Sequence, residues 1–299
     1  MLESGIDLAC PVCKSAVRQA SDKLECTQCA KQYKLRGSQP DFRLDVEEAA
    51  QGSDAENLDD TEKFQNKIKL FLRKFPGLYR FLVYTIGPAL LLPPSSQDFV
   101  KQVEKENPNA QTLSIGSGVL SLKGNITHLD YEPYPHLEVV GDAHHLPFPE
   151  NSFDAVVCES MLEHVLEPDQ VIAEMQRVLK PGGRCYVLIP FMFGFHAAPN
   201  DFQRLTHRGL EYRMKGFEKV ELKAISGPTS ALTSVLIEWS AIVLSFGIRP
   251  LYQLLALVFM VMYAPLKLLD FVLTFHPEAI RIASVLLYIG KKIDSGESS

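Results

Sequence analysis

Short apolar runs separated by polar stretches dominate the middle of the chain. Six such runs occur from Thr112 onward, at residues 112–115, 126–129, 138–140, 152–158, 184–189 and 219–225. Pro168 to Leu179 instead has the periodicity of an amphipathic helix, which Lys180-Pro181-Gly182-Gly183 would end. Strands that alternate with helices predict a doubly wound α/β sheet.

The C-terminal third is much more apolar than the rest. Residues 231–289 hold six charged side chains, and residues 250–266 hold none. Pro250 and Pro265 bracket the uncharged stretch, which is shorter than the roughly 20 residues of a spanning helix. Three alternatives stay open: a buried helical insertion, a hairpin that dips into one membrane leaflet, or a hydrophobic tunnel for a lipid-like substrate. The run 283–290 is typical of a last strand, so we expect a sheet domain over 101–299 with an apolar helical insertion at about 231–280.

Two segments of opposite charge precede this domain. Residues 44–62 carry eight acidic side chains and no basic one, which predicts a solvated linker over 43–62. Residues 63–80 carry six basic side chains and no acidic one, interleaved with apolar residues. Helices over 63–100 would therefore be basic and amphipathic, suited either to an anionic membrane surface or to packing on their own domain.

Four of the six cysteines lie close together near the start of the sequence, as two C-x2-C pairs separated by twelve residues: Cys10, Cys13, Cys26 and Cys29. The first residues contain acids and no apolar signal segment, which leads us to expect a cytoplasmic location with reduced thiols. Four thiolates at this spacing predict a structural Zn²⁺ site, because no ligand position is left for water. We therefore expect a zinc ribbon over residues 1–42. Cys158 and Cys185 lie in apolar runs and are expected in the core.

The charge balance bears on what the ribbon would contact. Residues 1–37 hold six basic and four acidic side chains, and a tetrathiolate zinc site adds about −2, so the ribbon is near neutral. The whole chain carries a net charge of −6. Nucleic-acid binding is therefore disfavoured, and a packing or protein-contact role for the ribbon is favoured over RNA contact.

Small and acidic residues follow the first two predicted strands. The first strand ends in Gly116-Ser117-Gly118, and the second ends in Asp130. Glycines at a strand end let the backbone approach a ligand closely. A carboxylate at the tip of the second strand is well placed to accept hydrogen bonds from a ribose diol.

Several longer motifs follow in order. They are G-D-A-H-H-L-P-F-P-E-N-S-F-D-A-V-V-C-E-S-M-L-E-H-V, then R-V-L-K-P-G-G, then P-F-x-x-x-x-H-x-x-P-x-D-x-x-R-x-T from Pro190 to Thr206. Over about residues 110–225 the chain resembles class I S-adenosylmethionine-dependent methyltransferases of the type 11 branch. The resemblance implies a Rossmann-like sheet and S-adenosyl-L-methionine as the cofactor.

The resemblance also implies cofactor-binding roles. The loop Gly116, Ser117 and Gly118 would flank the methionine part of the cofactor, and Asp130 would bind the ribose hydroxyls. Asp142 and Ala143 would meet the adenine, and Glu159 with Ser160 would line the pocket floor.

Two departures from the family pattern concern the first strand. Ser114 stands where family members usually carry an acid that orients the cofactor's amino-acid end. The distance from Gly116 to Asp130 along the chain also leaves room for only about one helical turn between the first two strands. Either departure is compatible with a domain that has lost catalysis.

Polar residues beyond the fourth and fifth strands are the candidates for catalysis. His164 would act as a general base, or would cap a helix and pack on the sheet. His196, Asp201 and Arg204 would grip an anionic substrate, or Asp201 and Arg204 would form an internal ion pair that orders their loop. His144 and His145 are expected to support the adenine loop rather than bind a metal.

Three functions are therefore compared. The first is an S-adenosylmethionine-dependent methyltransferase that acts on a small or lipid-like acceptor, cytoplasmic and peripheral at the inner face of a membrane. The second is an RNA methyltransferase that uses the zinc ribbon for substrate contact. The third is a non-catalytic cofactor-binding or scaffold protein on a decayed methyltransferase fold, motivated by Ser114 and the short first connection. Independently of these three, a protein partner could bind through the zinc ribbon.

Overall fold

The structure is a computed structural model that describes residues 5–44, 85–119, 121–196 and 200–293. The acidic linker expected over 43–62 and the basic stretch that follows it lie almost wholly outside the described residues. Helix α4, Ser96–Glu106, begins at a capping box formed by Ser95 and Asp98. This helix contains residue 100, at which the basic helices were expected to end and the sheet domain to begin.

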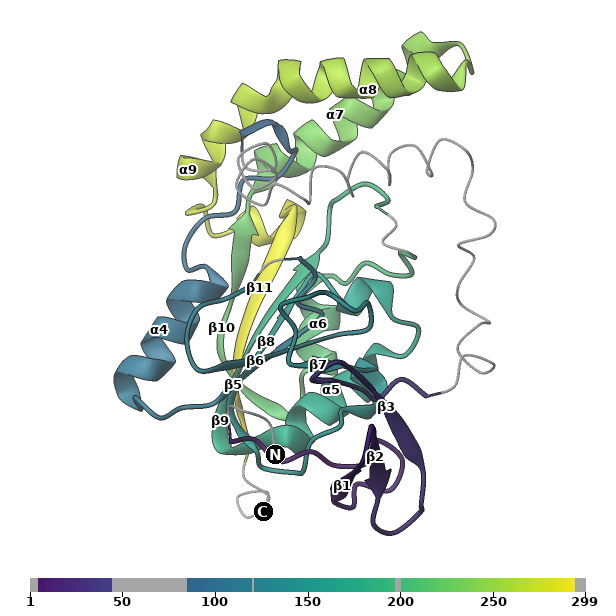
Figure 1. The fold of residues 1–299 in the computed structure, drawn as a ribbon. Coiled ribbons are helices and arrows are strands. Elements are labelled where there is room, and N and C mark those ends of the chain that lie inside the picture. The colour runs from purple at the N-terminus through teal and green to yellow at the C-terminus, as the bar shows by residue number, and fades with distance from the viewer. Residues whose placement is uncertain (1–4, 45–84, 120, 197–199, 294–299) are drawn as a thin grey trace.

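One mixed sheet contains every named strand (Figure 1). Its methyltransferase-like part has the order β7-β6-β5-β8-β9-β11-β10. The strands are β5 Thr112–Ile115, β6 Ile126–Asp130, β7 Val139–Val140, β8 Phe153–Glu159, β9 Leu179–Pro190, β10 Phe217–Ser226 and β11 Val285–Lys292. Strands β7, β6, β5, β8 and β9 are mutually parallel, whereas β11 is antiparallel to both of its neighbours. The predicted doubly wound sheet is confirmed, and so is the expectation that the final apolar run completes it.

Both faces of the sheet are covered. Phe99, Val100 and Val103 of α4 pack with Tyr186 and Leu287 on one face. The other face carries α5, Pro168–Val178, and α6, His207–Arg213. Side chains of successive strand residues point to opposite faces, which explains why β8 and β9 are apolar at nearly every position. Cys158 and Cys185 are fully buried among them, as expected.

The connection between β5 and β6 contains no helix in its described residues, 116–119 and 121–125. The single helical turn expected there is therefore not formed. Gly116, Gly118 and Gly124 all have positive φ, at 66°, 58° and 135°. Such a backbone turns sharply and does not propagate a right-handed helix.

The N-terminal ribbon extends the same sheet. Its strands are β1 Val17–Ala20, β2 Lys23–Cys26, β3 Gln32–Arg36 and β4 Gln39–Asp41, joined as antiparallel neighbours. Strand β4 pairs in parallel with β7 through Asp41 and Val140, and the amide of Phe42 donates to the Val140 carbonyl at 2.8 Å. Tyr33 and Phe42 belong to the same buried cluster as the α5 face of the sheet. The ribbon is thus packed as part of the domain.

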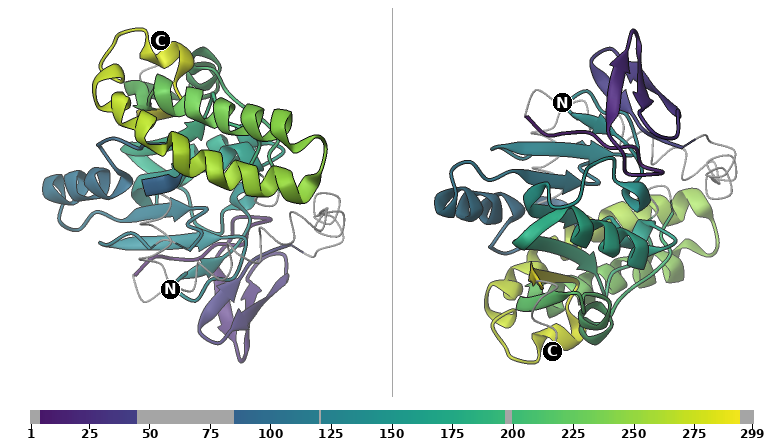
Figure 2. Two further views of the ribbon diagram at one scale, coloured as in Figure 1. Left: turned by 90° about the horizontal axis from the view of Figure 1, so that it is seen from above. Right: turned by 90° about the horizontal axis from the view of Figure 1, so that it is seen from below.

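The expected apolar insertion lies between β10 and β11. It consists of α7 Pro228–Ser245, α8 Arg249–Tyr263, the 3-10 turn η4 Ala264–Leu269, α9 Asp270–Leu273 and the 3-10 turn η5 Ala279–Ile282. Helices α7 and α8 pack on each other at one end of the molecule, whereas the β1–β2 hairpin lies at the opposite end (Figures 1 and 2). Half of α7 is buried, but no residue of α8 is. The alternative of a fully buried insertion therefore does not describe α8.

Two segments of the insertion are long and apolar enough to cross a membrane, judged by length and composition alone. They are Pro228–Ser245, with a mean hydropathy of 1.2, and Arg249–Leu273, with a mean hydropathy of 1.9.

Candidate functional site

The loop after β5 and the end of β6 meet at the carboxyl edge of the sheet. The backbone N–H of Gly118 donates to Asp130 Oδ2 at 2.7 Å, and the N–H of Glu132 donates to Asp130 Oδ1 at 2.9 Å. Each carboxylate oxygen can accept a second hydrogen bond. Asp130 therefore fixes the glycine loop and keeps acceptor capacity for a diol. A Cβ on Gly118 would meet open space, so the backbone here lies beside an open volume.

Ser114 lies at the base of the same loop. Its hydroxyl is 2.9 Å from the hydroxyl of Ser117, which also donates to the Ser114 carbonyl at 3.0 Å. Ser114 is buried in β5. The residue that departs from the family pattern thus stabilises the loop through Ser117, in place of the negative charge that an acid would bring.

Asp142 and Ala143 follow β7, as the resemblance requires. Asp142 caps the 3-10 turn η2, Ala143–His145, and its carboxylate accepts from the backbone N–H of His144 at 2.9 Å and contacts His144 Nδ1 at 2.7 Å. Burial acts to raise the pKa of Asp142, but the hydrogen bonds from His144 outweigh it and hold that pKa below its usual value. The same side-chain hydrogen bond raises the pKa of His144 against the effect of burial. The contact between His144 and Asp142 therefore favours the charged form of each side chain and stabilises the turn.

Glu159 and Ser160 end β8 at the same edge. Burial raises the pKa of Glu159, and a hydrogen bond with Ser96 partly opposes that shift. Ser160 has a φ of 46°, which is unusual for a residue other than glycine. Its N–H donates to the Leu188 carbonyl at 3.0 Å. Strained backbone of this kind is concentrated at ligand sites.

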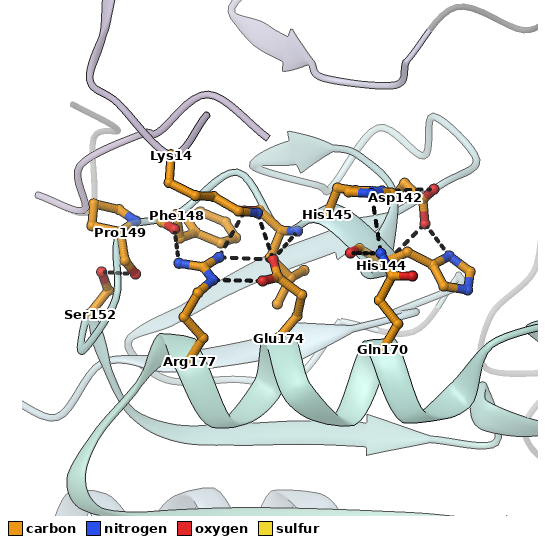
Figure 3. A network of polar contacts seen from close by, with 11 residues as sticks. Lys14, Asp142, His144, His145, Phe148, Pro149, Ser152, Gln170, Glu174 and Arg177 are labelled. Atoms are coloured by element: carbon orange, nitrogen blue, oxygen red, sulfur yellow. Dashed lines mark hydrogen bonds and ion pairs between the residues drawn. The ribbon is translucent and has the colours of Figure 1, made fainter. Parts of the chain in front are cut away.

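A polar network joins the ribbon to α5 and to the turn η2 with the segment after it (Figure 3). Lys14 of the ribbon donates to Glu174 of α5 at 2.8 Å and to the Leu146 carbonyl at 3.3 Å. Arg177 donates to both oxygens of Glu174, and Glu174 also accepts from the Leu146 N–H at 2.8 Å. In addition, the N–H of Ala9 donates to the Pro147 carbonyl at 2.9 Å. The ribbon therefore holds the segment that follows η2.

The four N-terminal thiols converge. One sulfur from each lies within 4.8 Å of the others, with 3.6 Å between Cys10 and Cys29 and 3.3 Å between Cys13 and Cys26. A tetrahedral site with Zn–S bonds of about 2.3 Å has edges of about 3.8 Å, so the four sulfurs fit a zinc ion. The backbone N–H and hydroxyl of Ser15 lower the pKa of Cys13 to about 6.

The residues singled out beyond β8 and β9 also lie together. Arg204 forms a two-pronged ion pair with Asp201 and donates to the Gly194 carbonyl at 3.0 Å. The N–H of His196 donates to Asp201 at 2.9 Å. This arrangement is that of the loop-ordering alternative. His164 lies against His196, with ring centroids 5.1 Å apart, and its Nδ1–H donates to the Asn200 carbonyl.

Glu163 directly precedes His164 but is not among the candidate residues that the sequence indicates. In the structure its side chain is fully buried beside His164 and His196, within η3, Leu162–His164. Glu163 could have been identified from the sequence, because a charged residue next to a candidate histidine is unusual among the apolar residues around it. The Lys14 contact to Glu174 was also missed, because 160 residues separate the two along the chain.

Residues 96–187 match the family described as "Methyltransferase domain". Together with the strand order and the motifs at the sheet edge, the match shows that the chain carries a class I S-adenosylmethionine-dependent methyltransferase domain.

Curated relatives align with a short part of the chain. It is 39% identical over 80 residues to the ubiquinone/menaquinone biosynthesis C-methyltransferase of Francisella tularensis, and 41% identical over 80 residues to that of Hahella chejuensis. Each alignment covers 27% of this chain and 29% of the relative. The chain thus spans less than a third of the length of these relatives.

Solved structures give weaker likenesses. The Burkholderia thailandensis 1,6-didemethyltoxoflavin-N1-methyltransferase has a TM-score of 0.44 and 12% identity, covering 93% of this chain and 99% of that one. The Haemonchus contortus phosphoethanolamine N-methyltransferase 2 has a TM-score of 0.39 and 16% identity, covering 71% and 57%. At this level of similarity nothing about the substrate follows.

Proposed function

We propose that this protein transfers the methyl group of S-adenosylmethionine to a lipid-like acceptor that it meets at the inner surface of a membrane. The observation that carries the proposal is topological. Strand β10 runs parallel to β9, since both are antiparallel to β11. The carboxyl end of β10 therefore lies at the edge where the cofactor residues gather, and α7 begins two residues beyond it.

The cofactor residues are assigned from this edge. The Gly116-Ser117-Gly118 loop would hold the methionine part, Asp130 the ribose hydroxyls, Asp142 with Ala143 the adenine, and Glu159 with Ser160 the pocket floor. Acceptors would then approach past His164 and His196. Asp201 and Arg204 are positioning residues in this assignment, because they bind each other and their own loop. Transfer from a sulfonium is largely a matter of holding donor and acceptor in line.

The helical insertion supplies the apolar surface. Gly194, in the loop after β9, donates its N–H to Ser234 of α7 at 3.1 Å, so the loop that carries His196 contacts the insertion. Many large apolar side chains of the insertion are exposed, among them Trp239, Ile242, Phe246, Leu254, Leu257, Phe271 and Phe275. Exposed apolar side chains that lie together are typical of membrane or partner contacts. The relatives named for ubiquinone and menaquinone biosynthesis also favour a small, apolar acceptor.

Vesicle binding tests the membrane part of this proposal. Leu257 and Val258 of α8 are 51% and 48% exposed. In sedimentation with vesicles of phosphatidylcholine and phosphatidylglycerol, changing both to Glu should weaken binding about tenfold or more, since burying one such side chain contributes about 1.5 kcal/mol or more. Val220→Glu is the matched control, because Val220 is 60% exposed on β10, outside the insertion. Equal binding by wild type and the double variant would contradict the proposal.

The alternatives are separated by other observations. The ribbon's contacts through Lys14, Gln39 and Phe42 go to its own domain, which favours a structural role over RNA contact. A scaffold that has lost catalysis would bind no S-adenosylmethionine or would bind it without turnover. Salt-sensitive binding of a tRNA or rRNA fragment would instead favour the RNA methyltransferase.

A further inference from the structure

The side chains of Glu163, His164 and His196 form a cluster at the carboxyl edge of the sheet, in which Glu163 is fully buried and the two histidines are partly exposed. Glu163 Oε1 lies 3.7 Å from His164 Nε2 and 3.6 Å from His196 Nε2. The Glu163 side chain is 0% exposed, and neither of its carboxylate oxygens has a hydrogen-bond partner among the described residues. A buried carboxylate without a partner is strongly destabilising. Something other than these side chains must therefore compensate it.

The position of the ring hydrogen on His164 indicates which atom faces the Glu163 carboxylate. Its Nδ1 contacts the Asn200 carbonyl, which can only accept, so Nδ1 carries the hydrogen. The other ring nitrogen, Nε2, lies 3.7 Å from Glu163 Oε1 and is the atom left to bind a cation. A proton or a metal ion held between Nε2 and the carboxylate would compensate the buried charge.

His196 completes the cluster from the loop after β9. Its Nδ1 lies 3.6 Å from Asp201 Oδ2 and 3.2 Å from Arg204 Nη2. Arg204 Nη2 can only donate, so in the structure Nδ1 is the acceptor of this contact. To bind a cation through Nε2, His196 must carry its hydrogen on Nδ1 and turn it toward Asp201 Oδ2, because a carboxylate in that position is the usual support of a metal-binding imidazole. Asp201 and Arg204 neutralise each other as an ion pair. The carboxylate of Glu163 is therefore the negative charge in the cluster that no other side chain compensates.

We propose that Glu163, His164 and His196 bind a divalent first-row transition-metal ion, separate from the four-thiol site. One ligand atom from each side chain lies within 4.8 Å of the others, and the 3.6–3.7 Å separations are close to the edge of about 3.4 Å expected for metal–ligand bonds of about 2.1 Å. Two imidazoles favour a transition metal over Mg²⁺ or Ca²⁺. Three protein ligands leave coordination positions open.

The role of this ion rests on the proposed function. The turn η3 begins three residues after the end of β8, beside Glu159 and Ser160, where an acceptor would meet the methyl group. An ion here would bind and orient an oxygen atom of the acceptor. The binding site itself depends only on the three side chains and is testable without turnover.

Cobalt titration of the full chain tests the site. The four-thiol site is first loaded with zinc, and Co²⁺ is then added while its visible absorption is recorded. One further equivalent should bind, with d–d bands but without the thiolate charge-transfer bands that Co²⁺ at cysteines would give. Glu163→Gln and His164→Gln should each weaken Co²⁺ binding about a hundredfold, given that even indirect supports of a metal cost 10–100-fold.

The matched control is Glu167→Gln, an exposed acid three residues beyond His164, which should leave the Co²⁺ affinity unchanged. If Glu163→Gln fails to fold, His196→Gln, at 31% side-chain exposure, provides the same test. Absence of a second cobalt site at millimolar Co²⁺, or affinities unchanged in these variants, would overturn the proposal. S-adenosylmethionine binding is measured separately by calorimetry. A wild-type protein that binds cobalt at this site but binds no S-adenosylmethionine would refute the proposed function without refuting the metal site.

Discussion

At the scale of single residues, charged groups at the carboxyl edge stabilise loops. Asp130 accepts from the backbone of Gly118, and Asp142 accepts from the backbone and ring of His144. Each carboxylate thus fixes a turn that would otherwise leave N–H groups without acceptors. Asp130 and Asp142, which are proposed to bind the cofactor, therefore also fix the loops that would surround it.

The His144–Asp142 pair predicts a pH-dependent stability. The pKa of His144 is raised by the pair, so its contribution to the free energy of unfolding is complete below about pH 6.5 and is lost as pH rises through the raised pKa. The pKa of Asp142 is lowered, so its contribution is present above about pH 3.9 and is lost as pH falls through the lowered pKa. The free energy of unfolding should therefore differ more between wild type and His144→Asn at about pH 5.5 than at about pH 8.5. A gap that is equal or larger at the alkaline pH would show that the pair is not charged.

The sequence predicted which residues end the strands but not what they contact. Gly116, Asp130 and Glu159 follow apolar runs, and strand ends are readable from such runs. Lys14 was not identified, because its partner Glu174 lies 160 residues away along the chain, and the contact of Glu163 with His196 likewise joins two separate loops. Contacts of this kind depend on the packing of the whole sheet, which no local pattern encodes.

At the scale of elements, two attachments keep the appended segments in place. The buried carboxylate of Asp270, in α9, accepts from the backbone N–H groups of Gly227, Thr229 and Ser230 at the start of α7. Lys14 and Ala9 attach the ribbon to the loop before β8. Both appended segments therefore depend on polar contacts made across the domain.

Asp270→Asn should lower the free energy of unfolding by about 2 kcal/mol. An amide has one acceptor oxygen and would turn its NH2 group toward N–H donors, leaving buried groups unpaired. Chemical denaturation measures the change. Asp22→Asn, in an exposed turn of the ribbon, is the control and should have little effect. An Asp270→Asn variant as stable as wild type would mean that the α7 terminus is satisfied in another way.

Zinc removal should weaken S-adenosylmethionine binding. If the ribbon unfolds without its ion, Lys14 no longer supports Glu174 and the Leu146 carbonyl, and a partly buried ion pair contributes about 1 kcal/mol, or about fivefold in affinity. Calorimetry before and after treatment with a chelator and a thiol reductant measures the effect. Lys14→Met in zinc-loaded protein should reproduce most of it. Unchanged affinity in both samples would show that the ribbon does not influence cofactor binding through the segment after η2.

At the scale of the whole molecule, one sheet joins three parts of different composition. The ribbon extends the sheet through β4, and the apolar insertion leaves it after β10 and returns at β11. The final strand was predictable because 283–290 is an isolated apolar run. The pairing of β4 with β7 was not, since Gln39–Asp41 is short and polar and its partner lies about a hundred residues away.

The central claim is that Asp130 and the adjoining loops bind S-adenosylmethionine, and calorimetric titration of the zinc-loaded protein tests it most directly. Wild type should bind the cofactor, and Asp130→Ala should bind it about a hundredfold more weakly, because two charge-assisted hydrogen bonds to a ribose would be lost. Asp22→Ala is the control and should bind as wild type does. No binding by wild type, or equal binding by Asp130→Ala, would contradict the account.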